Sequence, residues 1–234
     1  ITLVFQEVGA STFKMGRLKA GGRLFSVLGP LGHPSVVEKL PPEKSVLFVG
    51  GGVGIAPVFP IARAHHELGN RVISVIGARN KELMFWQEEM AKVSDELHVT
   101  YDDQGEFVTH ALERVLRDDV KRAGLSHIVA IGPVVMMENV YKTTQRICTE
   151  LAAPPVKVVV SLNPTMMDGT GMCGGCRIMV AGSAKYGCVD GPEFEAALVD
   201  FEGLKRRQTM YRDSEKKALD TYVDNFVCGE KTLS

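Results

Sequence analysis

The sequence predicts an α/β protein whose central region is a doubly wound parallel sheet. Three observations predict this fold. Short β-branched runs alternate strictly with amphipathic segments between residues 44 and 162, glycine or charged turns follow the runs, and the 234 residues hold enough apolar side chains to bury a core. The content of 45% hydrophobic and 24% charged residues is ordinary for a globular protein.

Five expected strands are apolar over nearly their whole length, which is the pattern of strands buried on both faces of a sheet. They cover residues 45–49, 71–77, 96–101, 126–132 and 156–162. Four amphipathic helices are expected between them, over residues 56–68, 81–93, 107–119 and 134–151. In such sheets ligands bind beyond the carboxyl ends of the strands, where the strand order reverses.

Three regions are expected along the chain. Residues 1–43 have a strand–turn–strand pattern that begins inside a strand-like run, which predicts the C-terminal part of an antiparallel β-barrel whose N-terminus is missing. Residues 44–162 form the sheet domain, and the sequence PPEK at 41–44 is the expected linker. Residues 163–234 begin with a cysteine loop too rich in glycine for a helix or strand and end in a charged, helical tail.

Composition and charge exclude several classes of function. A net charge of −1 argues against binding to nucleic acid or to an anionic membrane surface, since both reward a basic excess. The longest uncharged run, residues 46–62, contains four glycines and two prolines, whereas a membrane span needs about 20 mostly helix-compatible apolar residues. Five cysteines, an odd number with three in one loop, and the lack of a secretory signal fit a reducing cytoplasm.

A glycine cluster, GGGVGIAP at residues 50–57, follows the first expected strand. Without Cβ atoms, backbone N–H groups in this cluster can approach a pyrophosphate at the start of a helix. The spacing does not fit G-x-G-x-x-G, because the third position falls on Ile55 or Pro57. The cluster alone therefore leaves both a nucleotide site and a tight turn open.

The ends of the next three strands read GARNKEL (77–83), YDDQGEFVT (101–109) and GPVVMM (132–137). Together with GG-x-G-I-A-P, this ordered set resembles the pyridine-nucleotide domain of the ferredoxin–NADP reductase superfamily over residues 45–151. The resemblance implies three groups of nucleotide-binding residues: Gly51, Gly52 and Gly54 at the pyrophosphate, Gly132 and Met136 beside the nicotinamide, and Arg79, Asp103 and Gly105 near the adenosine.

At this nucleotide site one residue departs from the family pattern, and another allows two interpretations. Ile131 stands where the family usually has a cysteine before the Gly-Pro of the fourth strand, so no thiol is expected near the hydride path. Arg79 can pair with a 2′-phosphate or cover the face of the adenine. NAD and NADP both stay open.

In the same superfamily a β-barrel that holds FAD precedes the nucleotide domain. The turn GAST at residues 9–12, a short helix after it and GPLG at residues 29–32 resemble the second flavin signature of the family. The resemblance implies that Gly9, Ser11, Thr12 and Gly29 contribute to FAD binding, the hydroxyl and the helix start contacting the pyrophosphate. An ordinary helix cap is the alternative interpretation of GAST.

The cysteine loop predicts a metal site. Cys173 and Cys176 form C-x2-C and Cys188 follows after eleven further residues. A closed zinc site needs four Cys or His ligands, and no histidine follows His127; thiol–disulfide chemistry would leave Cys188 unexplained. Plant-type 2Fe-2S clusters use C-x4-C-x2-C…C, and counting back from Cys173 by that interval reaches Asp168.

The pattern D-x4-C-x2-C-x11-C therefore predicts a 2Fe-2S cluster held by Asp168, Cys173, Cys176 and Cys188. Glycines fit such a loop, because backbone N–H groups must wrap closely around the sulfides; they are Gly169, Gly171, Gly174 and Gly175. Other candidates for the fourth ligand are Asp190, Cys148 and Cys228.

The order of barrel remnant, nucleotide domain and cluster loop resembles the electron-transfer subunits of dihydroorotate dehydrogenase, which carry Cys where this chain has Asp168. The aspartate, the sequence CVDGPEF and the tail are more similar to the small subunit of NADH-dependent ferredoxin–NADP oxidoreductase, the flavin-based bifurcating transhydrogenase also called sulfide dehydrogenase. This second resemblance spans essentially the whole chain.

The resemblance implies an electron-transfer subunit. NAD(H) would exchange a hydride with FAD, and the 2Fe-2S cluster would pass electrons singly, with no side-chain acid or base required. The implied partner is a larger flavoprotein related to the glutamate synthase small subunit, and through it ferredoxin; residues 193–220 are the candidate contact. The alternatives are a subunit of an NAD-dependent dihydroorotate dehydrogenase and a non-enzymatic, zinc-stabilised nucleotide-binding module.

Overall fold

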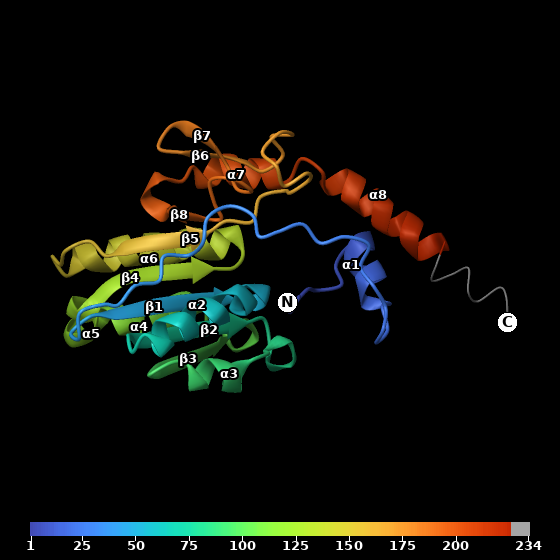
Figure 1. The fold of residues 1–234 in the computed structure, drawn as a ribbon. Helices are drawn as coiled ribbons and strands as arrows, with labels where there is room; N and C mark the ends of the chain where they lie inside the picture. Colours follow the sequence, from blue (N-terminus) through green and yellow to red (C-terminus); the bar gives the residue numbers. More distant parts are fainter. Residues whose placement is uncertain (226–234) are drawn as a thin grey trace.

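A six-stranded sheet forms the centre of the protein, with the strand order β3-β2-β1-β4-β5-β8. The computed structural model describes residues 1–225 (Figure 1). Five strands pair in parallel, as predicted: β1 (Ser45–Gly51), β2 (Arg71–Ala78), β3 (Glu96–Tyr101), β4 (Leu125–Ile131) and β5 (Lys157–Ser161). The sixth, β8 (Glu193–Glu195), pairs antiparallel with β5 and was not predicted. The doubly wound α/β class is thus confirmed.

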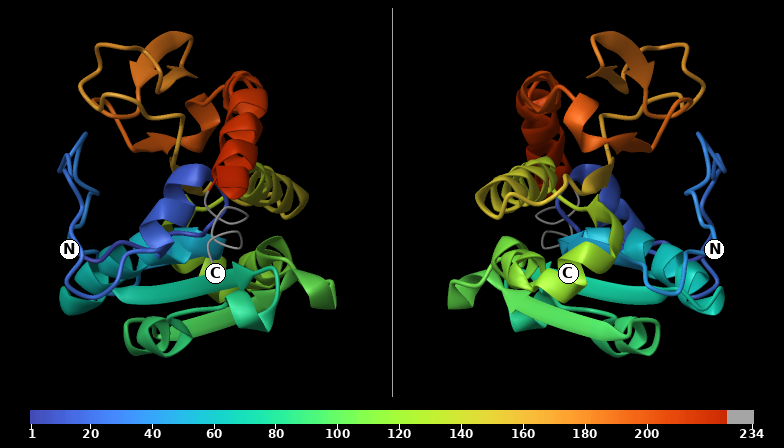
Figure 2. Two further views of the ribbon diagram at one scale, coloured as in Figure 1. Left: turned by 90° about the vertical axis from the view of Figure 1, so that its right-hand side faces the viewer. Right: turned by 90° about the vertical axis from the view of Figure 1, so that its left-hand side faces the viewer.

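Helices cover both faces of the sheet (Figure 2). Alternate residues of β1 point to opposite faces, so Val46 and Phe48 join one buried cluster while Leu47 and Val49 join the other. The first cluster is closed by α2 (Ile55–Glu67) and α3 (Gln87–Lys92). The second is closed by α4 (Val108–Arg117) and α6 (Val134–Glu150). This double burial explains why the strands are mostly apolar.

Two of the four predicted helices are interrupted. The helix expected over 81–93 is a 3-10 turn, η2 (Lys81–Leu83), followed by α3, because Trp86 adopts a left-handed conformation with φ of 54°. The helix expected over 107–119 ends at Arg117, and α5 (Asp119–Gly124) starts anew after it. Asp118 has an extended backbone there, and its side chain accepts a hydrogen bond from Lys121 N at 3.0 Å, which caps α5.

The strands expected in residues 1–40 are not formed. Within residues 1–44 the structure has the helix α1 (Ala10–Gly16) and otherwise irregular chain that runs along the sheet domain to β1 (Figure 1). A short helix was expected after GAST, and the helix begins inside that motif. A strand needs a paired neighbour to be stable, and this segment pairs with neither edge strand, β3 or β8. It is anchored instead by hydrogen bonds that its backbone N–H groups donate. Leu40 N donates to the side-chain Oδ1 of Asn70 at 2.8 Å, and His33 N donates to Gly191 O at 2.6 Å.

The region after β5 contains more regular structure than expected. The cysteine loop includes a hairpin of β6 (Arg177–Val180) and β7 (Ser183–Tyr186), so the expectation that glycine excludes strands there is wrong. The two-residue turn between them, Ala181 and Gly182, has φ values of 49° and 74°, as a type I′ turn requires. The short 3-10 turn η4 (Ala196–Leu198) follows β8.

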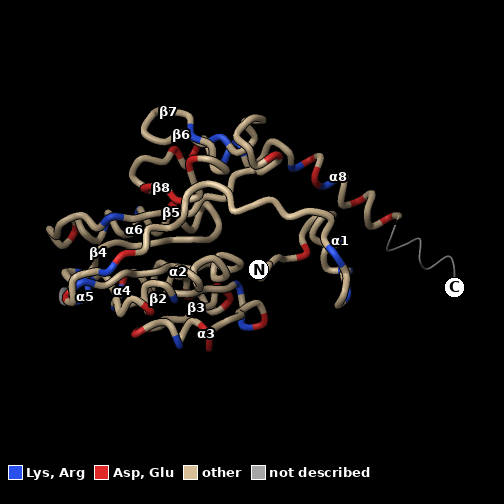
Figure 3. Tube along the Cα trace, in the orientation of Figure 1, with Lys and Arg blue, Asp and Glu red and all other residues tan. Residues whose placement is uncertain are grey.

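The charged tail is helical, as predicted. It forms α7 (Phe201–Gln208) and α8 (Arg212–Val223). Phe201 and Leu204 bury α7 against the sheet domain, whereas α8 extends outward and packs on α1 (Figure 1). Basic and acidic residues are interspersed along the described chain (Figure 3), and within residues 1–225 no helix is long and apolar enough to cross a membrane.

Candidate nucleotide and metal-cluster sites

The glycine turn after β1 packs directly against the end of β4. A Cβ atom on Gly51 would lie 2.2 Å from Met136 Sδ, and one on Gly54 would lie 2.2 Å from Ile131 O. Gly52 begins the 3-10 turn η1 (Gly52–Gly54) with φ of 54°, in the left-handed region. Gly51 and Gly54 therefore permit the close approach of the two segments, and Gly52 supplies the left-handed backbone of the turn.

The start of α6 completes this cluster of predicted residues. A Cβ on Gly132 would lie 2.9 Å from Met136 Cε and 3.1 Å from Gly51 O. From β1 the strands β2 and β3 are added on one side of the sheet, and from β4 the strand β5 is added on the other side. The space between the ends of β1 and β4 is therefore the switch point at which such sheets bind ligands. The structure brings the residues predicted for the pyrophosphate and nicotinamide to that point.

The residues predicted for the adenosine lie at the ends of the next two strands. Asp103 N donates a hydrogen bond to Arg79 O at 3.0 Å, which joins the loops after β2 and β3. Gly105 ends the 3-10 turn η3 (Asp102–Gln104) with φ of 73°. Arg79 is exposed, so its guanidinium faces solvent at the carboxyl edge of the sheet. This edge offers a cation and glycine turns to an anionic ligand.

The residues predicted for FAD are placed differently. Thr12 Oγ1 accepts hydrogen bonds from Val8 N and Gly9 N and donates one to Gly9 O, each at 3.0 Å. Its hydroxyl thus caps α1, as in the alternative interpretation of GAST, and Ser11 is exposed. The GPLG segment with Gly29 packs on the cysteine loop instead. This packing is visible in the short distance of 2.9 Å between Leu31 Cδ1 and the position that a Cβ on Gly169 would occupy. The two expected flavin segments therefore make separate contacts.

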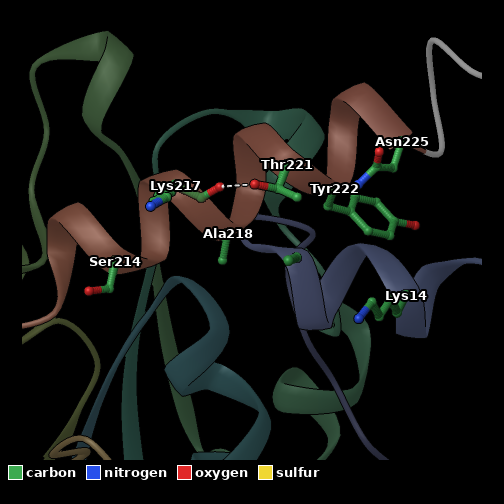
Figure 4. Close-up of a pocket in the computed structure, with 8 residues that line it drawn as sticks. Lys14, Ser214, Lys217, Ala218, Thr221, Tyr222 and Asn225 are labelled. Carbon is green, nitrogen blue, oxygen red and sulfur yellow. Dashed lines mark hydrogen bonds between the residues drawn. The ribbon is translucent and has the colours of Figure 1, made fainter.

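A cavity of about 440 Å³ lies between α1 and α8 (Figure 4). The rings of Phe13 and Tyr222 stack at a centroid distance of 6.3 Å, and Lys14 Nζ lies 5.9 Å from the Tyr222 ring centroid. Thr221 and Lys217 line the α8 side. Sequence reasoning assigned this tail to a partner contact and missed its packing on α1. The signal was Tyr222, the aromatic residue of a helix that has many charged residues.

The carboxylate of Asp168 is held by the backbone of its own loop. Asp168 Oδ1 accepts from Thr170 N at 2.9 Å and Oδ2 accepts from Cys173 N at 2.8 Å. These N–H groups, that of Thr170 foremost, hold the pKa of Asp168 below its usual value. The carboxylate is therefore ionised at neutral pH and lies beside the first cysteine of the motif.

Two of the three cysteines form a buried pair. Cys176 Sγ and Cys188 Sγ lie 3.2 Å apart. Two thiolates on one tetrahedral metal with bonds of about 2.3 Å would be about 3.7 Å apart. Burial, together with the neighbouring Cys176, raises the pKa of Cys188, and a bound metal would deprotonate such a thiol. The pair fits two ligands of one metal ion.

Cys173 is exposed, and its Sγ accepts a hydrogen bond from Gly175 N at 3.3 Å. Within residues 1–225 no three of the His, Cys, Asp and Glu side chains already converge as a metal site. The structure thus brings together Cys176 with Cys188, and Asp168 with the backbone of Cys173. The four donor atoms do not meet at one point.

The glycines of the cysteine loop allow it to fold around a bound group. Gly169, Gly171 and Gly174 have φ values of 74°, 83° and 68°. A Cβ on Gly171 would lie 2.7 Å from Val189 Cγ2, so this loop also approaches the chain near Cys188 closely. Soft thiolates, one carboxylate and a glycine-rich backbone fit a 2Fe-2S cluster.

The competing fourth ligands are engaged elsewhere or lie outside the described residues. Asp190 Oδ2 accepts from Tyr186 N at 2.7 Å, and its Oδ1 lies 3.5 Å from Lys185 Nζ. Cys148 is buried in the core beside α6 residues. Cys228 lies outside the described residues. Asp168 is distinguished by its contact with a predicted ligand residue, because its Oδ2 accepts a hydrogen bond from Cys173 N.

A nucleotide-type switch point and a cysteine loop on one chain define an oxidoreductase with a ferredoxin-reductase-like fold. Residues 48–142 match the family model of the oxidoreductase NAD-binding domain. Residues 163–200 match the model of the iron–sulfur cluster binding domain of dihydroorotate dehydrogenase B.

Whole-chain comparisons narrow this class. The chain is 40% identical to a dihydroorotate dehydrogenase B (NAD(+)) electron transfer subunit homolog of Thermotoga maritima, over 94% of this chain and 74% of that relative. It is 32% identical to the dihydroorotate dehydrogenase B electron transfer subunit of Geobacillus kaustophilus, over 85% of this chain and 73% of that relative. The chain belongs to this family of electron-transfer subunits and their homologues.

A solved structure agrees with this assignment. A chain in the structure of NADH-dependent reduced ferredoxin–NADP oxidoreductase superposes with a TM-score of 0.79 and 38% identity. The match covers 94% of this chain and 75% of that chain. The expected resemblance to both groups of proteins is confirmed.

Proposed function

We propose that this protein is the electron-transfer subunit of an NADH-dependent ferredoxin–NADP oxidoreductase, and that it moves electrons between NAD(H), FAD and a 2Fe-2S cluster. One observation carries the proposal: the segment expected to face the flavin, GPLG at 29–32, packs on Gly169 of the cluster loop. Electron transfer needs the two groups to be near each other, and this contact joins their binding segments. The 38% identity over 94% of the chain supports the same reading.

The nucleotide belongs at the carboxyl edge of the sheet. Gly51, Gly52 and Gly54 line the pyrophosphate, Gly132 and Met136 flank the nicotinamide, and Arg79, Asp103 and Gly105 lie near the adenosine. Support comes from their convergence on neighbouring strand ends within the nucleotide domain, residues 44–162. No acid or base is assigned, since hydride transfer needs orientation and exclusion of water rather than proton transfer by a side chain.

FAD binding is assigned to residues 1–43. Gly9, Ser11, Thr12 and Gly29 are the residues expected to contact it. The short helix α1, which begins within GAST at Ala10, supports this assignment, as does the position of the GPLG segment beside the cluster loop. The flavin supplies the step between the two-electron nicotinamide and a one-electron acceptor.

The third region, residues 163–234, holds the cluster through Asp168, Cys173, Cys176 and Cys188. A bound 2Fe-2S cluster supplies one-electron transfer. The chain keeps Asp168 ionised through the Thr170 and Cys173 amides, and the left-handed glycines let the loop close around the group. A carboxylate is a harder ligand than a thiolate, so iron on Asp168 is more labile than iron on cysteine.

The partner is a larger flavoprotein subunit related to the glutamate synthase small subunit, which passes electrons on to ferredoxin, and the complex is cytoplasmic. Methionines on the cluster loop support docking there: Met166, Met167 and Met172 are 48%, 57% and 89% exposed. Exposed methionines adapt to a partner surface. The charged helices α7 and α8 follow this loop in the sequence and would add polar contacts.

A second candidate is the electron-transfer subunit of an NAD-dependent dihydroorotate dehydrogenase. The match of residues 163–200 to the cluster domain of that enzyme favours it. Both candidates share the same internal chemistry and differ in the partner. Anaerobic affinity capture of the tagged chain from its own cells, with the partner identified by mass spectrometry, separates them. A glutamate-synthase-like flavoprotein supports the first candidate, and a dihydroorotate-oxidising subunit overturns it in favour of the second.

The ligand assignment has its own test. Asp168→Ala is expected to bleach or destabilise the visible cluster absorption, whereas Asp168→Cys retains it because a thiolate replaces the carboxylate. Asp190→Ala is the matched control, since Asp190 is the nearby carboxylate that caps the hairpin. An unchanged spectrum and iron content in Asp168→Ala would refute Asp168 as a ligand.

A further inference from the structure

One cation of α7 reaches the backbone between two predicted ligands. Arg207 Nη2 donates hydrogen bonds to Gly174 O at 3.2 Å and to Gly175 O at 3.1 Å. These are the two carbonyl groups between Cys173 and Cys176. The Arg207 side chain is half-buried, so this charge-assisted contact is only partly screened by water.

The peptide that Arg207 holds is also the one that contacts a cysteine sulfur. Gly175 N donates to Cys173 Sγ at 3.3 Å. The Gly174 carbonyl and the Gly175 N–H belong to one peptide unit, which is planar, so fixing the direction of its C=O fixes the direction of its N–H. The same unit is also polarised, because a cation at the carbonyl strengthens the hydrogen bond donated by the amide. Arg207 and Cys173 Sγ are therefore linked through a single peptide.

The helix that carries Arg207 is firmly placed. Asp200 Oδ1 accepts from Gly203 N at 2.9 Å and caps α7, and Leu204 is buried in the core. Gln208 Nε2 donates to Asn163 O at 3.4 Å, at the start of the cluster loop. The guanidinium thus acts from a rigid element upon a glycine-rich loop.

We propose that Arg207 is a positioning residue for the cluster loop, which aims the Gly175 N–H at Cys173 Sγ and raises the reduction potential of the group bound there. The proposal rests on the proposed function for the presence of a cluster. Hydrogen bonds to ligand sulfur and nearby positive charge stabilise the reduced, more negative form, and this raises the potential. Loss of the contact also frees the loop and weakens metal retention.

The test compares three variants of the full chain with the wild type: Arg207→Gln, Arg207→Lys and Arg206→Gln. Arg206 is the matched control because it is the exposed neighbour on the same helix with the same charge. Arg207→Gln is expected to lower the midpoint potential in an EPR-monitored titration and to speed iron loss to a chelator by about 10- to 100-fold. Arg206→Gln is expected to match the wild type, and Arg207→Lys to restore most of the potential because it keeps the charge.

A second measurement does not need the cluster. In the metal-free chain, amide hydrogen exchange over residues 173–177 is expected to rise in Arg207→Gln and to stay at the wild-type rate in Arg206→Gln. Equal potentials and equal iron loss in Arg207→Gln and Arg206→Gln would overturn the proposal. Faster exchange spread over α7 with an unchanged potential would overturn it as well, since Arg207 would then only stabilise the helix.

The failure of this proposal is distinguishable from failure of the proposed function. If the wild-type protein contains no iron and sulfide, the electron-transfer proposal fails. The exchange comparison in the metal-free chain still decides whether Arg207 positions the loop.

Discussion

Leu31 and Gly169 are in contact, although they are far apart in the sequence. Leu31 Cδ1 lies 2.9 Å from the position that a Cβ on Gly169 would occupy, and Leu28 Cδ2 lies 3.0 Å from it. The contact places the segment expected to face the flavin on the loop expected to hold the cluster. This arrangement is the structural basis for reading the chain as one electron-transfer unit.

Gly169→Ala tests that contact against a matched control. Gly169 and Gly182 both have φ of 74°, but a Cβ on Gly182 meets nothing within 4 Å. Both substitutions to Ala carry backbone strain of about 1–3 kcal/mol, and Gly169→Ala adds a clash with Leu31. Urea unfolding is expected to show a larger loss for Gly169→Ala than for Gly182→Ala, with loss of bound iron in the first variant alone. Equal losses of stability and equal iron content would contradict the role given to this contact.

The approach of Gly51 to Met136 predicts a rescue. A Cβ on Gly51 would collide with the flexible Met136 side chain, whereas one on Gly54 would collide with the backbone oxygen of Ile131. Gly51→Ala is expected to lower the stability of the protein, and this loss is expected to be smaller in a Met136→Ala background, because the obstacle is removed. Gly54→Ala costs about 1–3 kcal/mol of stability and is not recovered by Met136→Ala.

Urea unfolding of the single and double variants checks this coupling. The same response of Gly51→Ala and Gly54→Ala to Met136→Ala would show that the two glycines do not meet different obstacles.

Stability is expected to fall as the pH falls from about 6.5 toward 4. Burial, together with the nearby His65 and Lys157, lowers the pKa of His127 to about 4, and the pKa of His65 is lowered as well, chiefly by burial. Between the unfolded and folded pKa values the unfolded chain binds a proton that the folded chain does not. Each such histidine therefore removes up to about 1.4 kcal/mol of stability per pH unit as the pH falls.

His127→Gln is expected to flatten this dependence in urea unfolding between pH 7 and 5. The rings of His65 and His127 lie 6.0 Å apart at their centroids, and the nearby His65 helps to lower the pKa of His127. His110, which lies in the exposed first turn of α4, serves as the control. An identical slope in wild type and His127→Gln would contradict the assignment.

The hairpin turn offers a stabilising change. Ala181 has φ of 49° in a two-residue type I′ turn, where Asn or Gly is preferred. Ala181→Asn and Ala181→Gly are each expected to raise stability by about 0.5–1 kcal/mol, because the strain of a left-handed alanine is removed. A rise of the melting temperature checks this, and Ala184→Gly, within β7, is expected to lower it. A lower melting temperature for both Ala181 variants would contradict the turn geometry.

The parallel sheet was predictable because its strands are buried on both faces, which leaves long β-branched runs such as Val72–Ile76. The short strand β8 was missed because three residues of sequence carry no period, and its pairing with β5 depends on tertiary structure. The hairpin of β6 and β7 was missed because glycine count hid the alternation of buried Ile178 and Val180 with exposed neighbours. The apolar pattern in residues 1–40 predicted strands that are not formed, since a strand also needs a neighbouring strand with which to pair.

The candidate site was predictable where a motif fixes both residue type and spacing. The glycines after β1 follow this rule, because the structure brings them to the switch point between β1 and β4. The four cluster ligands stay a prediction, since their donor atoms do not converge within residues 1–225. Arg207 was not predictable, because its contact with the loop comes from the packing of α7 and no local motif marks it. Thr12 shows that a short motif can be ambiguous, because GAST fits both a flavin-binding turn and the helix cap that its hydroxyl forms.

The account depends most directly on the metal content of the protein as it is made in the cell. Iron and acid-labile sulfide are to be assayed in chain purified without oxygen, alongside zinc. The account predicts iron and sulfide in equal amounts, with no stoichiometric zinc. Zinc without sulfide, or a chain free of both iron and sulfide, would contradict it.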